Sequence, residues 1–263
     1  MSHDEIRENL EWFIETYGIE ELCLSGGEPT VHPSFAENIR LSREKGLCLY
    51  LHTNGISFGK AHFASRHAPF ISRVLVGLSC HNEASCGELT GIEKSFQARL
   101  DGIINLQNQN VPLRTNCVVL RQNYKNLPDI GKLLLSLNVK KALFTLPFFF
   151  ERCDEQVEAF VPPDLGKVAP YLQETLELLM GAGFSVFVQG LPPCRLGPFE
   201  PYAEVDPDRA FVDYNHQKEN HGFLFSGMLG YQQNDECRAC RHGAICWGFP
   251  PSGALGSTFP EFL

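Results

Sequence analysis

Short apolar runs that alternate with amphipathic helical patterns constrain the fold of this chain more than any other feature. The runs follow one another at steps of roughly 25 to 40 residues, and helical spacing of apolar residues fills the intervals. This alternation is typical of βαβ units, whose strands pair in parallel. We therefore predict an α/β fold, a partial (β/α) TIM-like barrel of parallel strands. The expected strands are Glu21–Ser25, Leu47–His52, Arg73–Cys80, Leu113–Leu120, Lys141–Leu146 and Phe184–Gln189.

The first helix has clear signals at both ends, and two common nucleotide-binding motifs are missing. Ser2 and Glu5 have the spacing of a capping box, and Gly18 is typical of a helix end. A long helical stretch is expected at Pro162–Met180, with a possible break at Pro170. No GxGxxG motif opens a helix and no GxxxxGK[ST] motif occurs, so dinucleotide and P-loop functions lack their usual support.

The turn after the first expected strand carries the residues Gly26, Gly27 and Glu28, followed by Pro29. Paired glycines let a ligand lie against the backbone, because no Cβ intervenes and positive φ costs little. Glu28 adds one fixed negative charge, and Pro29 pushes it toward extended geometry. The layout suits a ligand with a cationic amine. A solvated strand-to-helix turn is the alternative interpretation.

The carboxyl-terminal ends of the other expected strands also carry polar residues. They are Thr53-Asn54, Ser79, Asn116 and Gln189. In a (β/α) barrel the carboxyl ends of the strands meet at one rim, where the chemistry takes place. Any one polar strand end is weak evidence, but their common placement favours a site at this rim.

The character of the sequence changes near Gly190. Prolines crowd the stretch that follows, and apolar periodicity is weak there. We expect a barrel-like domain at residues 1–190 and an irregular, Cys-rich C-terminal extension at 191–263. A segment this irregular needs something other than helices and strands to fix it.

Four cysteines in the extension, Cys194, Cys237, Cys240 and Cys246, predict a metal or cluster site. The CxxC spacing allows two sulfurs to reach one ion or cluster, and zinc and an iron–sulfur cluster are both compatible with four thiolates. Zinc ribbons pair two CxxC turns, whereas the second pair here would be Cys246 and the distant Cys194, which favours a cluster. His242 is a possible substitute ligand, although a lone His in a polar loop is more often exposed. The other six of the ten cysteines are interpreted as free thiols.

Composition narrows the range of partners. The formal net charge is −9 and no Lys/Arg-rich run occurs, so binding to nucleic acid is not expected. No apolar stretch approaches the length that spans a membrane, and the residues after Met1 are acidic rather than signal-like. We expect a soluble, cytoplasmic protein with no membrane partner.

Taken together, these motifs resemble the radical S-adenosylmethionine (SAM) superfamily over nearly the whole chain. The turn after the first strand looks like the GGEP segment of that family, and the later strand ends and the cysteines look like its other characteristic segments. The matching residues are Leu24–Thr30 with His32-Pro33-x-Phe35, His52–Gly55, Val76–Ser79 with Leu89-Thr90-Gly91 and Ser95-Phe96, Asn116–Val119 with Asn123 and Leu127, and the four cysteines of the extension.

The resemblance implies a site and its cofactors. Gly26, Gly27 and Glu28 would hold the amino group of SAM, and Ser79 and Asn116 would lie near its ribose. A reduced [4Fe-4S] cluster would cleave SAM to a 5′-deoxyadenosyl radical that abstracts hydrogen from the substrate. The four cysteines of the extension resemble the auxiliary-cluster regions of peptide-modifying members, with zinc as the alternative. The implied partners are a peptide or protein substrate and an electron donor.

One motif of the family is missing. CxxxCxxC, which binds the catalytic cluster, occurs nowhere in the 263 residues. We therefore expect a radical SAM enzyme whose first strand and cluster loop are absent from this chain. The alternatives are a non-catalytic scaffold with a structural metal site, and a zinc-stabilised hydrolase or transferase.

Overall fold

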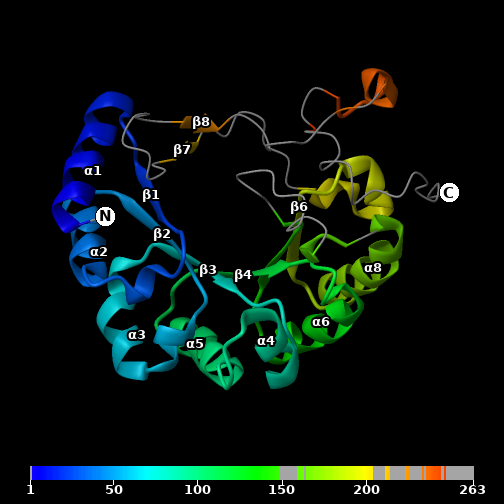
Figure 1. Ribbon diagram of the computed structural model, residues 1–263, viewed down its shortest axis with the longest axis horizontal. Coiled ribbons are helices and arrows are strands. Elements are labelled where there is room, and N and C mark those ends of the chain that lie inside the picture. The colour runs from blue at the N-terminus through cyan, green and yellow to red at the C-terminus, as the bar shows by residue number, and fades with distance from the viewer. Residues whose placement is uncertain are drawn as a thin grey trace. The chain divides into compact units, whose positions relative to one another are not determined.

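The structure is a computed structural model, and it describes residues 2–147, 159–162, 164–203, 211–213, 223–225, 233, 235–243 and 246. Its main feature is one six-stranded sheet whose strands follow one another in chain order (Figure 1). The strands are β1 (Glu21–Leu24), β2 (Cys48–Thr53), β3 (Arg73–Gly77), β4 (Leu113–Val118), β5 (Lys141–Thr145) and β6 (Ser185–Gln189). All six expected strands are present, with ends that differ by a few residues.

Strands β1 to β4 pair in parallel, as the alternation predicts. Leu24 lies opposite Leu51, Thr53 opposite Val76, and Gly77 opposite Asn116. This register brings the carboxyl ends of the four strands to one edge of the sheet, which is where ligands bind in parallel α/β folds.

Helices occupy the intervals between the strands. They are α1 (His3–Tyr17), α2 (Phe35–Glu44), α3 (Ala61–His67), α4 (Glu83–Thr90), α5 (Phe96–Asn108), α6 (Leu127–Ser136) and α8 (Leu165–Gly181). Short 3-10 turns join them, among them η1 (Pro29–Val31) and η2 (Ile56–Gly59). Helix α8 contains Pro170 and continues through it, so the possible break at this residue does not occur.

Contacts within the chain cluster into two units, Met1–Asn116 with Ser136–Lys141, and Cys117–Leu135 with Ala142–Leu263. The domain boundary expected at residue 190 stays a prediction. In the second unit the extension contains two short strands that the sequence did not indicate. They are β7 (Phe211–Asp213) and β8 (Phe223–Phe225), which pair antiparallel.

Helix α1 has the ends that its sequence predicts. The Ser2 hydroxyl accepts the Glu5 N–H at 3.2 Å, and the Glu5 carboxylate accepts the Ser2 N–H at 2.8 Å. Gly18 ends the helix in the left-handed conformation, with φ of 59°. The buried face of α1 packs Leu10 against Leu41 and Leu47.

Helix α5 and turn η2 touch through their backbones. A Cβ atom added to Gly102 would lie 2.2 Å from the Gly55 carbonyl oxygen, and one added to Gly59 would lie 2.6 Å from the Ala98 carbonyl oxygen. The Asn105 side-chain amide donates to the carbonyl of Gly59 at 3.1 Å. Because only glycine permits such an approach, the turn after β2 has one fixed position against this helix.

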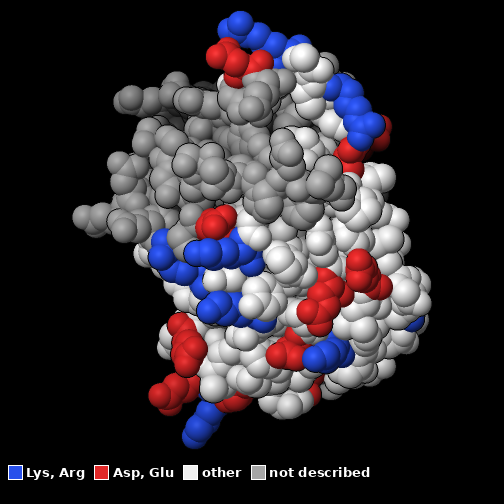
Figure 2. All heavy atoms as spheres, turned by 90° about the vertical axis from the view of Figure 1, so that its right-hand side faces the viewer, with Lys and Arg blue, Asp and Glu red and all other residues white. Residues whose placement is uncertain are grey.

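No described helix is both long and apolar enough to cross a bilayer. On the face drawn in Figure 2, basic and acidic side chains both occur and lie close to one another, so the described surface there carries no field of a single sign.

Substitution of Gly102 tests the close contact of α5 with η2. Gly102→Ala places a methyl carbon 2.2 Å from the Gly55 carbonyl oxygen. We expect this overpacking to destabilise the fold by about 1–3 kcal/mol or more. Gly87→Ala in α4 is the matched control, since its Cβ meets no atom within 4 Å. Urea denaturation should show a large loss for the first variant and none for the second. Equal stabilities would contradict the contact.

The environment of His67 predicts that stability depends on pH. Its buried ring packs on Phe35 and Phe63 at centroid distances of 5.5 and 4.4 Å. Burial, and then the charges of Arg66 and Arg40, lower the pKa of His67 below its usual value. The neutral ring is therefore favoured in the folded state, and its stabilisation is lost as the pH falls below about 6.5 toward the folded pKa. We expect the free energy of unfolding, measured in urea, to fall less between pH 7 and pH 5 in His67→Leu than in the unmodified protein. Parallel pH profiles would contradict this.

Candidate functional site

The turn after β1 presents bare backbone at the carboxyl edge of the sheet. Gly26 has φ of 121°, a conformation that other residues rarely adopt. Both Gly26 and Gly27 are exposed, and a Cβ added to either would meet no atom within 4 Å. A ligand can therefore lie directly on this turn.

The Glu28 carboxylate, which follows the two glycines, joins the end of β1 to the end of β2. Its Oε1 accepts hydrogen bonds from the Thr30 N–H at 3.1 Å, the Thr30 hydroxyl at 2.6 Å and the Thr53 hydroxyl at 2.7 Å. Its Oε2 accepts the Asn54 N–H at 2.6 Å. Pro29 begins η1 and Glu28 caps it, so the sequence around this carboxylate holds it in place locally.

The arrangement of donors leaves one carboxylate oxygen less occupied than the other. Oε1 has three donors and Oε2 has one, while a carboxylate oxygen offers about two lone pairs. Oε2 therefore retains room for one further donor, and an ammonium group lying on the Gly26-Gly27 backbone has the right charge for it.

Ser79 lies two residues after the end of β3, and Asn116 lies in the neighbouring strand β4. The Leu78 N–H donates to the Asn116 carbonyl at 2.9 Å, which fixes the end of β3 against β4. Both side chains are half-buried. The structure thus brings the five residues expected around SAM to one edge of four parallel strands in the first unit, with Gly26, Gly27 and Glu28 in one turn.

A second group of candidate residues lies in the other unit. Cys194 is in η5 (Pro193–Arg195), Cys237 is in η7 (Asp235–Ala239), and Cys240 and Cys246 follow it. All four cysteines line one small pocket, together with His242. The structure therefore brings together the four sulfurs that the sequence singled out.

Among the described residues, no three His, Cys, Asp or Glu side chains are arranged to bind one metal ion. Tetrahedral zinc needs all four sulfurs about 2.3 Å from one point, whereas a cluster is held by thiolates distributed around several iron atoms. Four thiolates are chemically suited to either group.

The backbone shapes the cysteine loop. The Cys240 N–H donates to the Cys237 carbonyl at 3.2 Å, the Gly243 N–H to the Cys240 carbonyl at 2.9 Å, and the Cys246 N–H to the His242 carbonyl at 2.8 Å. A Cβ added to Gly243 would lie 2.8 Å from the Cys237 carbonyl oxygen. These successive tight turns bring residues of the CxxC segment and Cys246 to the same pocket.

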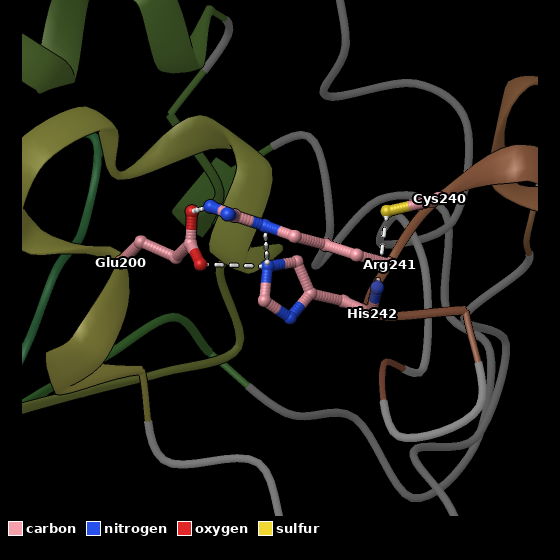
Figure 3. A network of polar contacts seen from close by, with 4 residues as sticks. All are labelled: Glu200, Cys240, Arg241 and His242. Carbon is pink, nitrogen blue, oxygen red and sulfur yellow. Dashed lines mark hydrogen bonds and ion pairs between the residues drawn. The ribbon is translucent and has the colours of Figure 1, made fainter.

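Two polar side chains fasten this loop. The Gln233 amide donates to the carbonyls of Gly243 and Cys246 at 2.6 and 2.7 Å. Glu200 forms an ion pair with Arg241 and lies 2.7 Å from the His242 ring nitrogen (Figure 3).

Glu200 lies in η6 (Gly197–Tyr202), which directly follows the turn of Cys194, so it ties that segment to the loop of Cys240. The hydrogen bond from Arg241 lowers the pKa of Glu200 more than any other contact does.

Sequence reasoning missed Gln233 and Glu200, because a single polar residue in an irregular segment carries no periodic or spacing signal. It also assigned no structural role to Gly243, although a glycine three residues after Cys240 is a recognisable sign of a tight turn. His242 is half-buried, and one of its ring nitrogens lies against the Glu200 carboxylate. The His242 side chain therefore takes part in the contact between the cysteine loop and η6.

Comparison with known families gives a match over about half of the chain. The family model described as the radical SAM superfamily matches residues 1–134. The PqqA peptide cyclase of Ruegeria pomeroyi is 23% identical over 264 aligned positions, which cover 88% of this chain and 69% of that protein. The Fe-coproporphyrin III synthase of Methanosarcina barkeri is 26% identical, over 50% of this chain and 33% of that protein. The chain thus spans about a third to two thirds of the length of these relatives.

Solved structures share the fold. The protein anSMEcpe with bound AdoMet, which is SAM, superposes with a TM-score of 0.63 at 14% identity, over 99% of this chain and 80% of that one. The same protein with bound AdoMet and a Cp18Cys peptide gives a TM-score of 0.61 at 15% identity, over 99% of this chain and 84% of that one. The expected α/β fold, a partial TIM-like barrel of parallel strands, is confirmed.

Proposed function

Since the chain belongs to the radical SAM superfamily, we propose that it functions in the SAM-dependent radical modification of a peptide or protein. The observation that carries the proposal is the open Gly26-Gly27 backbone beside the fixed Glu28 carboxylate. Peptides occur in the names of two similar proteins, the PqqA peptide cyclase and the peptide-bound anSMEcpe. These names support a peptide or protein substrate.

In this proposal the carboxyl edge of β1 to β4 binds SAM. The backbone of Gly26 and Gly27 and Oε2 of Glu28 receive the amino group, and Ser79 and Asn116 face the ribose. Their positions at adjacent strand ends support this division, because SAM is long enough to lie across several strands. The chain's own contribution is to bind and orient SAM and to exclude water around it.

The catalytic cluster is a separate question. A [4Fe-4S] cluster bound beside SAM supplies radical hydrogen abstraction in this superfamily, but none of the 263 residues belongs to a CxxxCxxC motif. The proposal therefore assigns residues of this chain to SAM and to the cysteine site, and none to a catalytic cluster.

The cysteine site is proposed to hold an auxiliary iron–sulfur cluster. Cys194, Cys237, Cys240 and Cys246 around one pocket support it, and the loop fixed by Gln233 supports it as well. Zinc is the alternative occupant. The residues from 191 onward would then form the cluster-binding part of the protein.

The second candidate is a non-catalytic relative that binds SAM or a peptide without radical chemistry. Two observations separate the candidates. The enzyme predicts a CxxxCxxC motif in the coding sequence upstream of Met1, and formation of 5′-deoxyadenosine under reducing conditions by the protein that contains it. An in-frame stop codon upstream without such a motif favours the non-catalytic relative.

Binding of SAM can be tested with one methyl group. Gly27→Ala has no neighbour within 4 Å and needs no positive φ, so we expect no loss of stability. Its Cβ would stand where the amino group lies, and calorimetry should show SAM binding weakened about tenfold or more, equivalent to about 1.4 kcal/mol.

Methylthioadenosine, which lacks the amino acid part of SAM, should bind Gly27→Ala and the unmodified protein equally. Gly87→Ala is the protein control. Unchanged SAM affinity in Gly27→Ala would exclude the amino-group site.

The cysteine site predicts a loss of metal on substitution. Cys240→Ala, purified without oxygen, should lose most of its iron and sulfide, and the part of the chain after Gly190 should become more sensitive to protease. Cys48→Ala, an exposed cysteine outside the site, is the matched control. If the unmodified protein contains zinc and no sulfide, the site holds a zinc ion and not a cluster. Unchanged metal content and protease resistance in Cys240→Ala would refute the site.

A further inference from the structure

A chain of hydrogen bonds joins helix α5 to the Glu28 carboxylate. The Arg99 guanidinium Nη1 donates to the Asn54 carbonyl at 3.2 Å. The amide of the same peptide group, the Gly55 N–H, donates to the Thr53 hydroxyl at 3.1 Å. That hydroxyl donates to Oε1 of Glu28 at 2.7 Å. Each link donates in the same direction, from the cation to the carboxylate.

The direction of the bonds has an energetic meaning. A guanidinium that polarises a carbonyl makes the amide of that peptide group a better donor, and the effect passes through the hydroxyl. Thr53 is only 6% exposed, so water competes little for these bonds. The carboxylate at the far end is therefore held by a polarised chain as well as by its local contacts with Thr30.

Arg99 is an unusual residue for its position. Its side chain is 7% exposed, and it lies on the face of α5 that packs against η2. Its Nε is buried without a hydrogen-bond partner in the described part of the structure. Burying a cation is costly, and an apolar residue would serve better if packing were its whole task. The Asn54 carbonyl gives the buried guanidinium a hydrogen-bond acceptor.

The rest of the interface fixes the geometry of the chain. Gly55 has φ of 82°, and its carbonyl contacts Gly102 of α5 with no room for a side chain. The Asn54 side-chain oxygen accepts the Ile56 N–H at 2.9 Å, which closes the turn. The Gly55–Ile56 peptide group is therefore held both by α5 and by the Asn54 side chain, and Arg99 donates to the Asn54 carbonyl directly before it.

We propose that Arg99 is a positioning residue for the amino-group site, acting through the Asn54–Gly55 peptide group and Thr53 on Glu28. This rests on the proposed binding of SAM at Gly26, Gly27 and Glu28. Through this chain, Arg99 holds Oε1 of Glu28 in its hydrogen bond with the Thr53 hydroxyl. The other carboxylate oxygen, Oε2, is then directed toward the ligand. Glu28 then needs no reorganisation when a cationic amine binds.

The test compares variants that break the chain with variants that spare it. Arg99→Met removes the cation but keeps a long side chain, and Thr53→Val removes the hydroxyl but keeps the branched shape. Thr53→Ser restores the hydroxyl. Asn105→Ala disturbs the same α5–η2 interface at the Phe58 and Gly59 carbonyls without touching Asn54. Each protein is titrated with SAM by calorimetry well below its melting temperature.

We expect Arg99→Met and Thr53→Val each to raise the Kd for SAM about tenfold, and the double variant to raise it little further, because both cut one chain. Thr53→Ser should bind almost as the unmodified protein does. Asn105→Ala should melt at a lower temperature with unchanged Kd. Hydrogen exchange of the Gly55 amide, measured by NMR without ligand, should be about tenfold faster in Arg99→Met than in Asn105→Ala.

The outcomes separate this proposal from the one on which it rests. If the unmodified protein does not bind SAM, the proposed function fails, and the amino-group site fails with it. If it binds SAM and Arg99→Met binds equally well, only the role of Arg99 is refuted. Additive losses in the double variant, or an equal loss of affinity in Asn105→Ala, would reduce Arg99 to a packing residue. If Arg99→Met does not fold, Arg99→Gln, which keeps a side-chain donor without the charge, replaces it in the same comparison.

Discussion

The candidate SAM site depends on one carboxylate that the fold uses for its own construction. Glu28 accepts four hydrogen bonds, two from Thr30 after β1 and one each from Thr53 and Asn54 at the end of β2, so a side chain joins the two strand ends. The glycine turn next to it has no side chain to hold it, and Gly26 is in a conformation with positive φ. The position of the glycine turn therefore depends on that of Glu28. Such a carboxylate offers a ligand a fixed charge, since its orientation is already determined before binding.

The sequence predicted the regular elements well and the contacts between them poorly. Strand and helix positions follow from apolar periodicity, and the ends of α1 follow from Ser2, Glu5 and Gly18, because these are local signals. The paired glycines, Glu28 and the four cysteines were recognisable because their chemistry is tied to short motifs. The bond from Arg99 to Asn54 was not predictable, because it joins segments far apart in the sequence and an Arg in an amphipathic helix usually faces solvent. The strands β7 and β8 are too short to give a periodic signal.

The two candidate sites are built by different means. The first uses strand ends that a parallel sheet brings together, so its residues come from several elements and their order follows from the topology. The second uses tight backbone turns that Gln233 and Glu200 hold in place, and its cysteines lie in or after the short 3-10 turns η5 and η7. A sheet determines its edge whether or not a ligand is bound. In a loop of this kind, the metal or cluster proposed for the four cysteines would add order on binding.

The contact between Gly102 and Gly55 has a consequence for how α5 can be placed during folding. A helix packed through side chains can settle in several neighbouring registers, because side chains adapt. Here the backbone of α5 lies directly on a carbonyl, and sliding the helix by one residue, about 1.5 Å, would bring a side chain to a place with no room for it. The close contact between the two glycines therefore allows only one position of the helix along its axis. In that position the Arg99 guanidinium reaches the Asn54 carbonyl.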